Sequence, residues 1–225
     1  MNTFLNTLSL LIAKDLRIEA RSRQTLGLVL VLGILIVVVL GMGLGAQNNI
    51  PGFSATAVLW VAYLFSGVLC FEKTFAVERN DGVLSGLMLA PIDGGVIYLA
   101  KLLANVALVF AVALVITPAG ILFFGFDLSA APLTFAGIIG LSVIGFCAVG
   151  TLFSAVVSST RLQGGLLAMM VFPISLPLVA MSTQLMLRLF RDHQAPVTTD
   201  FGMLVAFDVI FIVASWLVFE MVLEP

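Results

Sequence analysis

The sequence is poor in charged residues and in the side chains that most enzymes use. Only 10% of its 225 residues are charged, and it holds one histidine, His193, and two cysteines. Soluble globular domains carry about 25% charged residues. So little charge, together with 61% hydrophobic residues, excludes such a domain and indicates an integral membrane protein. The length suits one domain over 1–225.

Motifs for nucleotide binding and hydrolysis are also missing. No GxxxxGK[ST] segment occurs, so a P-loop cannot hold a nucleotide in this chain, and neither HExxH nor GxSxG is present. A membrane protease would need paired intramembrane aspartates, a Ser/His dyad or a metal site. The sequence has only Asp208 deep in an apolar run, and His193 lies in a predicted loop. We therefore expect no catalytic residue, no metal site and no directly bound cofactor.

The two cysteines, Cys70 and Cys147, lie within apolar segments. There a thiol usually behaves as a small buried hydrophobe. Because no CxxC or Cys/His cluster occurs, neither a redox motif nor a structural zinc site is supported. The formal net charge of -2 says nothing in favour of nucleic acid, and we expect no such partner.

Long hydrophobic runs dominate the chain. A helix needs about 20 mostly apolar residues to cross a bilayer. By that measure the sequence predicts six spans, at about 25–46, 54–76, 97–124, 133–157, 162–188 and 201–223. We expect an all-α membrane protein. The end of the second span is hard to place, since that helix could run on to Asn80.

Residues 3–23 have the pattern of an amphipathic helix. Its apolar residues recur at helical spacing and its basic residues lie toward the other side: Leu5, Leu8, Ile12 and Leu16 against Lys14, Arg17 and Arg21. Such a helix tends to lie in the membrane interface, and a plain cytoplasmic extension of the first span is the alternative. No small-residue cleavage site follows, so we expect no secretory signal peptide.

Lysine and arginine set the predicted orientation, because short loops rich in them stay in the cytoplasm. An even number of crossings puts both termini on one side. With the termini inside, eight basic residues are cytoplasmic and two are external: Lys14, Arg17, Arg21, Arg23, Lys73, Arg79, Lys101 and Arg161 against Arg188 and Arg191. We expect a multi-pass protein with both termini in the cytoplasm and only short external loops.

Small residues in the spans predict close helix contacts, as is usual in lipid. They form a GxxxG at 41–45 and line the fourth span at Ala136, Gly140, Gly145 and Gly150.

Three prolines, Pro118, Pro173 and Pro177, lie inside predicted spans. Each removes a backbone donor, which predicts a helix kink. Pro173 and Pro177 are four residues apart and so bend the fifth span around nearly the same face. That bend either opens a lateral groove or only shapes the helix.

Asp208 lies seven residues into the sixth span, about 10 Å deep at the helical rise. A charge near the bilayer centre costs about 2.5–3.5 kcal/mol on insertion scales, so ionisable residues there usually face a cavity or a partner. One interpretation is a polar contact in a translocation path or subunit interface. The other is a protonated or hydrogen-bonded structural residue.

The loop at 77–96 is the most informative polar stretch. Asp81-Gly82 is a turn signal, because glycine accepts the left-handed conformation that ends a helix. Pro91 stops whatever helix follows, and Asp93 is placed to cap the helix of the third span.

Between that turn and that proline, the apolar residues predict a short amphipathic helix: Val83, Leu84, Leu87 and Met88. A helix of about two turns is marginal in water. Its apolar face therefore needs a partner groove, unless it lies on the membrane surface.

The run at 78–91, Glu-Arg-Asn-Asp-Gly-Val-Leu-Ser-Gly-Leu-Met-Leu-Ala-Pro, resembles the cytoplasmic loop of the CcmB family. Leu-Ala-Lys at 99–101, the segment 150–162 and the opening at 14–19 are also similar. The family comprises the permease subunits of the haem exporter ABC complex in cytochrome c maturation. The likeness covers nearly the whole chain in length, spans and spacing. The Glu-Arg-x-Asp-Gly turn also resembles a pattern of ABC-2 type exporters.

The resemblance implies an ABC-2-like permease in the bacterial inner membrane. It would pair with a separate CcmA-like ATP-binding subunit and work with CcmC, CcmD and CcmE-like haem-handling proteins, alongside a second copy of itself. ATP would be hydrolysed by the partner, and haem would be cargo of the complex. This chain has only Trp60 and Trp216, far apart, and no intramembrane histidine, so we expect a coupling role and not a stable haem site.

Under this interpretation, the loop docks on the ATP-binding subunit through its charged turn and its apolar insert: Glu78, Arg79, Asp81, Gly82, Leu84, Leu87 and Met88. One alternative is a membrane scaffold that assembles the haem-transfer proteins without transport. Another is an ABC-2 permease for a different substrate. A scaffold would also need a docking loop, so the motif does not separate these functions.

Overall fold

Every element in the described part of the chain is an α-helix. The computed structural model describes residues 2–21, 23–45, 52–75, 93–125, 131–159, 165–191 and 198–223. The helices are α1 (Asn2–Arg21), α2 (Arg23–Gly45), α3 (Gly52–Thr74), α6 (Gly94–Phe124), α7 (Pro132–Ser159), α8 (Leu166–Arg191) and α9 (Thr198–Leu223). All but α1 are long and apolar enough to cross a membrane. The predicted all-α class with six spans is confirmed.

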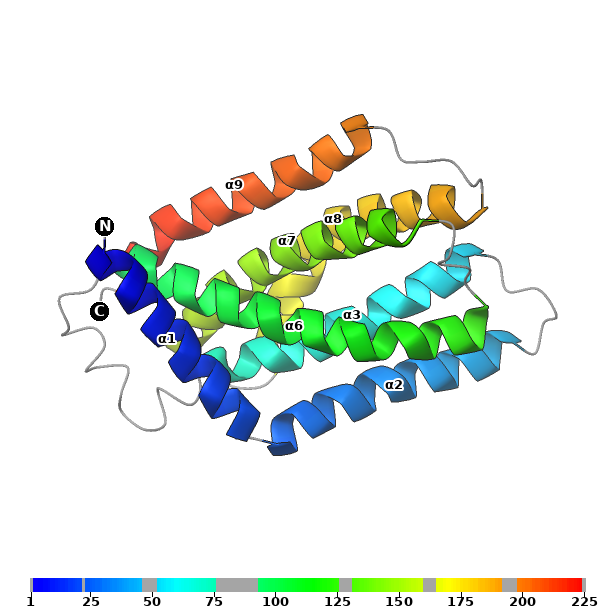
Figure 1. Ribbon diagram of the computed structural model, residues 1–225, viewed down its shortest axis with the longest axis horizontal. Helices are drawn as coiled ribbons and strands as arrows, with labels where there is room; N and C mark the ends of the chain where they lie inside the picture. Colours follow the sequence, from blue (N-terminus) through cyan, green and yellow to red (C-terminus); the bar gives the residue numbers. More distant parts are fainter. Residues whose placement is uncertain are drawn as a thin grey trace.

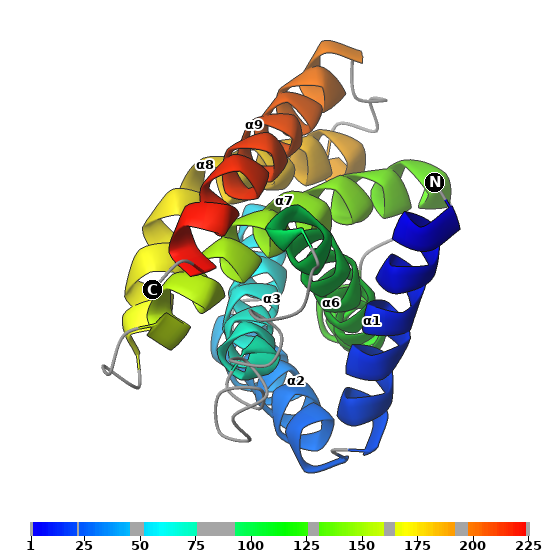
Figure 2. The same ribbon diagram turned by 90° about the vertical axis from the view of Figure 1, so that its left-hand side faces the viewer.

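The six long helices run side by side, and α1 crosses them obliquely at one end (Figure 1). Helix α1 packs mainly against α6 and also touches α2, at the outer edge of the bundle (Figure 2). Its Phe4, Leu5 and Leu10 are exposed, which suits a helix lying in a membrane interface. The start of α1 and the end of α9 lie at the same end of the molecule (Figure 1).

Helices α3 and α7 form the centre of the bundle. In their most apolar windows 67% and 61% of residues are buried, against 22–33% in the other four spanning helices. Gly150 of α7 allows α3 and α7 to approach each other closely, because a Cβ at this position would meet the ring of Phe71 on α3. That ring also packs on Phe146, with 5.0 Å between the ring centroids.

At the other small residues that were predicted to allow close helix contacts, the outcome is mixed. Gly145 faces the Asp208 carboxyl, and Gly41 faces Phe123 and Phe124 on α6. Nothing lies near a Cβ added at Gly140. The prediction of close contacts is therefore confirmed at Gly41, Gly145 and Gly150 and wrong at Gly140 and at Ala136, which is exposed.

The helix that follows the loop begins at Gly94, three residues before the predicted span at 97–124. The predicted cap accounts for this start, because Asp93 Oδ1 accepts a hydrogen bond from the Gly95 amide at 2.8 Å. Helix α3 ends at Thr74, two residues before its predicted end, and the proposed extension toward Asn80 lies outside the described residues.

The prolines lie inside continuous helices, Pro118 in α6 and Pro173 and Pro177 in α8. All three are exposed on the surface of the bundle. The bends that we expect at these prolines stay predictions. Helix α8 begins at Leu166, later than the predicted start at 162.

Candidate functional site

The residues predicted to dock on an ATP-binding subunit all lie outside the described residues: Glu78, Arg79, Asp81, Gly82, Leu84, Leu87 and Met88. His193 lies outside them too. What the structure describes is where the loop leaves and re-enters the bundle, at the end of α3 and the start of α6. The candidate site is built from the side chains at these two helix ends.

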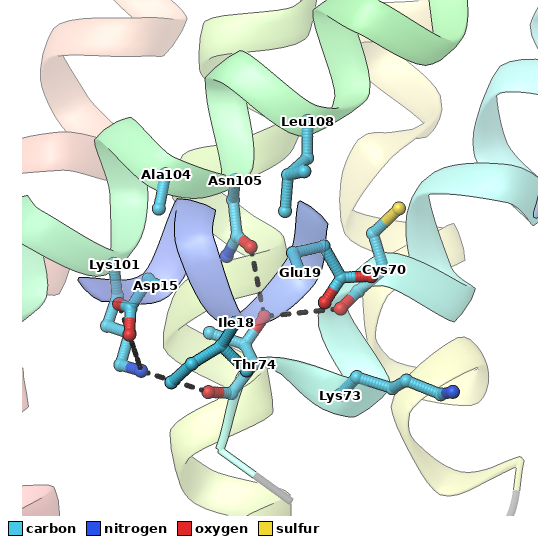
Figure 3. Close-up of a pocket in the computed structure, with 10 residues that line it drawn as sticks. All are labelled: Asp15, Ile18, Glu19, Cys70, Lys73, Thr74, Lys101, Ala104, Asn105 and Leu108. Carbon is cyan, nitrogen blue, oxygen red and sulfur yellow. Dashed lines mark hydrogen bonds and ion pairs between the residues drawn. The ribbon is translucent and has the colours of Figure 1, made fainter. Parts of the chain in front are cut away.

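Lys101 on α6 joins three helices at this point (Figure 3). Its Nζ lies 3.1 Å from Oδ2 of Asp15 on α1 and donates to Asp15 Oδ1 at 3.2 Å. It also donates to the backbone carbonyl oxygen of Thr74 at 3.1 Å. Thr74 is the last residue of α3, where carbonyl groups have no donor within their own helix. The lysine therefore caps α3 while it holds α1.

The Asp15–Lys101 ion pair is largely shielded from water. The Lys101 and Asp15 side chains are 6% and 13% exposed, and the Lys101 ammonium lies 5.3 Å from the centroid of the Phe75 ring. Burying an ammonium is costly unless its donors are satisfied, and here a carboxylate, a carbonyl and a ring face supply the partners. Lys14 also pairs with Asp15, at 3.3 Å, but its side chain is 35% exposed, and exposed pairs contribute little.

Hydrogen bonds extend from Thr74 to the central helix α7. The Thr74 hydroxyl donates to Asn105 Oδ1 at 3.0 Å, and Asn105 Nδ2 donates to Thr151 Oγ1 at 2.8 Å. Asn105 and Thr151 are both buried. Asp15, Thr74, Lys101, Asn105 and Thr151 thus form one connected set across α1, α3, α6 and α7. We call these five residues the polar junction.

In the sequence, Lys101 counts among the basic residues that set orientation and belongs to the family-like segment at 99–101, and Asp15 belongs to the family-like opening at 14–19. Their role as partners was missed. One signal was present, since Lys101 and Asn105 lie four residues apart in an apolar helix. Polar residues at that spacing share a face, and in a span that face points to the bundle interior.

A cavity of about 40 Å³ opens beside the polar junction. The residues around it are Asp15, Ile18, Glu19, Cys70, Lys73, Thr74, Lys101, Ala104, Asn105 and Leu108 (Figure 3). This volume admits water but is far below the roughly 300–1,000 Å³ of small-molecule sites. Burial raises the pKa of Glu19 on its rim, and the positive charge of Lys73 partly offsets that rise.

The carboxyl group of Asp208 on α9 has surroundings unlike those of the Lys101 ammonium. Its side chain is buried, at 4% exposure, and neither carboxyl oxygen has a hydrogen-bond partner among the described residues. It fills the space that Gly145 leaves on α7, beside Phe207 and Leu178. The hydrogen-bonded structural role is therefore unsupported within the described part of the chain.

The two cysteines are buried and form no disulfide, which confirms their predicted role as small buried residues. Cys70 borders the cavity, whereas Cys147 lies in the core at 0% exposure. No cluster of three or more potential metal ligands occurs in the parts of the chain that the structure describes.

Comparison with known proteins gives one consistent result. Residues 6–223 match the family model of the CcmB protein. The chain is 24% identical over 179 residues to heme exporter protein B of Pseudomonas aeruginosa, a match that covers 79% of each chain. It is 30% identical over 95 residues to the protein of that name from Rhodobacter capsulatus, covering 42% of this chain and 44% of that one.

A shorter match joins it to heme exporter protein B of Escherichia coli K12, at 34% identity over 62 residues and 28% of each chain. The Rhodobacter and Escherichia matches thus span less than half of those relatives. The family model, in contrast, extends from the first third of α1 to the last residue of α9. With its six apolar helices, this multi-pass membrane protein belongs to the CcmB family.

Proposed function

We propose that this chain is the membrane-spanning permease subunit of an ABC-type haem exporter that serves cytochrome c maturation. The observation that carries the proposal is the family match over residues 6–223. Relatives named heme exporter protein B support haem as the cargo of the complex. The protein lies in the bacterial inner membrane, with both termini and the loop at 77–96 in the cytoplasm, as the distribution of basic residues favours.

The ATP is hydrolysed by a separate CcmA-like subunit, because this chain has no P-loop. The loop docks on that subunit through Glu78, Arg79 and Asp81, with Leu87 among the residues of its apolar insert. Movement of the loop then displaces the end of α3 and the start of α6, to which it is directly joined. CcmC, CcmD and CcmE-like proteins handle the haem in the same complex, and this subunit itself holds no stable haem site.

The docking assignment is tested by changing Leu87 to Asp. A charge in the apolar insert removes its fit to a partner groove, so copurification with the ATP-binding subunit is lost while membrane insertion is kept. Leu133→Asp is the matched control, since Leu133 is 86% exposed at the start of α7, at the far end of the bundle. Survival of the complex with Leu87→Asp shows that the docking assignment is wrong.

The cargo is tested by deleting the gene and measuring c-type cytochromes. We expect them to disappear and to return when the gene is restored. Intact cytochrome levels in the deletion strain would exclude a role in haem maturation and favour an ABC-2 permease for another substrate.

A membrane scaffold without transport is the competing function. Among the described residues, the cavity at the polar junction and one lined by Met181 and Arg188 measure about 40 Å³ and about 30 Å³, which is below the volume of a small-molecule site and fits a scaffold. Cys147 separates the two functions, because at 0% exposure its thiol reacts only if the helices part. In a Cys70→Ala background, ATP should increase labelling of Cys147 by a membrane-permeant thiol reagent if the subunit is a permease. Labelling that is independent of ATP identifies a scaffold.

A further inference from the structure

We infer that the Asp15–Lys101 ion pair makes helix α1 a moving part of the coupling mechanism, so that displacement of the loop at 77–96 is transmitted to α1 through Lys101. The inference rests on the proposed function, because it takes the loop to receive movement from an ATP-binding partner.

Lys101 connects the two helices that flank the loop. It belongs to α6, about two turns after the helix begins at Gly94, and its ammonium binds the carbonyl of Thr74 at the end of α3. A displacement of the loop that separates these two helix ends must lengthen that bond. The same ammonium holds Asp15, so the strain reaches α1 directly.

The two sides of α3 differ in how firmly they are packed. Toward α7, the ring of Phe71 fills the notch at Gly150, and Ser154 Oγ donates to the Phe71 carbonyl oxygen at 2.6 Å. A contact of this kind cannot slide without opening a void or a clash. The α3–α7 side is therefore the fixed side.

Toward α1, a cavity separates α3 from its neighbour. Ile18 and Glu19 of α1 border it from one side, and Cys70 and Lys73 of α3 from the other. Across it, burial raises the pKa of Glu19, and the positive charge of Lys73 partly offsets that rise. Water in a polar cavity can rebridge shifted groups at little cost. Helix α1 can therefore shift against α3 while α3 and α7 stay together.

The ion pair is a polar link between α1 and α6, the helix against which α1 packs, and we take it to transmit the force. An ammonium or a carboxylate left alone in a buried site is strongly unfavourable, so Asp15 and Lys101 move together as long as both are charged. Neutralising both removes this polar link, keeps the packing of α1 on α6 and leaves neither of the two buried positions with a lone charge. The double change Asp15→Asn with Lys101→Met is therefore the variant that disconnects α1 with least damage to the fold.

The experiment measures the contact between α1 and α3 in the complete complex. Ile18→Cys is introduced with the native Cys70 and with Cys147→Ala, so that two thiols face the same cavity. Membranes that contain the ATP-binding subunit are treated with a bifunctional thiol cross-linker with and without ATP. In the chain with the native ion pair, we expect ATP to change the cross-link yield about fivefold or more, the usual scale of coupling between sites.

The double variant is expected to insert and to copurify with the ATP-binding subunit at the native level. Its cross-link yield should no longer respond to ATP, and c-type cytochromes should fall about fivefold or more. Lys14→Met is the matched control, because Lys14 pairs with the same carboxylate from a partly exposed position. That control should keep both the ATP response and the cytochromes.

Two results would overturn the inference. One is a native cross-link yield that does not change with ATP, a measurement that needs no altered ion pair and so does not depend on how the double variant folds. The other is a double variant with a full ATP response and normal cytochromes. In either case, cytochromes that still require the gene leave the proposed function standing, whereas cytochromes that do not require it refute the proposed function itself.

Discussion

Lys101 and Asp208 are both buried ionisable residues of spanning helices, at 5% and 4% exposure, but their surroundings are opposite. Lys101 binds a carboxylate and a backbone carbonyl. Asp208 has no partner within the described residues and fills the notch at Gly145. A satisfied buried charge fastens the helices around it, while an unsatisfied carboxyl is a cost that the fold carries. Although the two residues are equally buried, replacing Lys101 is therefore expected to destabilise the protein, whereas replacing Asp208 is expected to cost little.

The largest effect is expected from Lys101→Met alone. It leaves the part-buried Asp15 carboxylate with Lys14 in place of its main partner, and the cost is at most the roughly 3–5 kcal/mol of breaking a fully buried pair from one side. Thermal unfolding of the purified protein in detergent should show the loss, and Asp15→Asn in the same chain should recover most of it. A loss no larger than that of Lys14→Met would mean that the ion pair does not fasten α1.

Gly145→Ala is expected to be the next largest. A Cβ at this position meets the Asp208 carboxyl oxygen, and overpacking of a core typically costs about 1–3 kcal/mol. Removing the obstacle with Asp208→Ala should restore most of the stability, in the same unfolding assay. If the double variant is as unstable as Gly145→Ala, then the carboxyl is not what limits the space.

Asp208→Ala alone is expected to cost little, or to stabilise the protein by up to about 1 kcal/mol, because a buried polar group without a partner is itself unfavourable. The useful measurement is cytochrome maturation beside stability. Stable protein with lost cytochromes identifies Asp208 as a polar contact used in another state of the protein. Stable protein with normal cytochromes identifies it as a structural residue.

The smallest effect is expected at Glu19. Burial raises its pKa above the ordinary 4.5, so packing of α1 favours the protonated form. That contribution is complete below the ordinary pKa and is lost as the pH rises through the raised one. Native protein should therefore lose stability over this window relative to Glu19→Gln, measured as unfolding temperature against pH. Parallel curves for the two proteins would contradict the assignment.

The spans were predictable because each is a long apolar run that must satisfy its own backbone. The start of α6 was predictable from Asp93, since a cap depends only on the neighbouring residues. What the sequence did not predict reliably was which face of each span packs against its neighbours. Helices that are apolar all round carry no direction in their pattern, so nothing local separates Gly140, which faces open space, from Gly150, which faces Phe71.

The candidate site was predictable only in part. Asp15 and Lys101 are 86 residues apart, and their contact depends on α1 folding back over α6. The carbonyl that Lys101 binds is open only because α3 ends at Thr74, a boundary that apolar composition leaves uncertain. The docking residues such as Arg79 and Leu87 stay predictions.

The length of α6 has a consequence for the membrane. Its 31 residues extend about 46 Å at 1.5 Å per residue, whereas the hydrocarbon layer is about 30 Å thick. The helix must therefore tilt in the bilayer, or about three of its turns must protrude from the hydrocarbon layer. Lys101 lies about 10 Å from the start of the helix, so if the excess length protrudes at the loop end, its ammonium lies near the boundary between hydrocarbon and headgroups. A thicker bilayer would draw this ammonium toward the lipid tails, which makes the strength of the α1 attachment depend on the lipid composition around the protein.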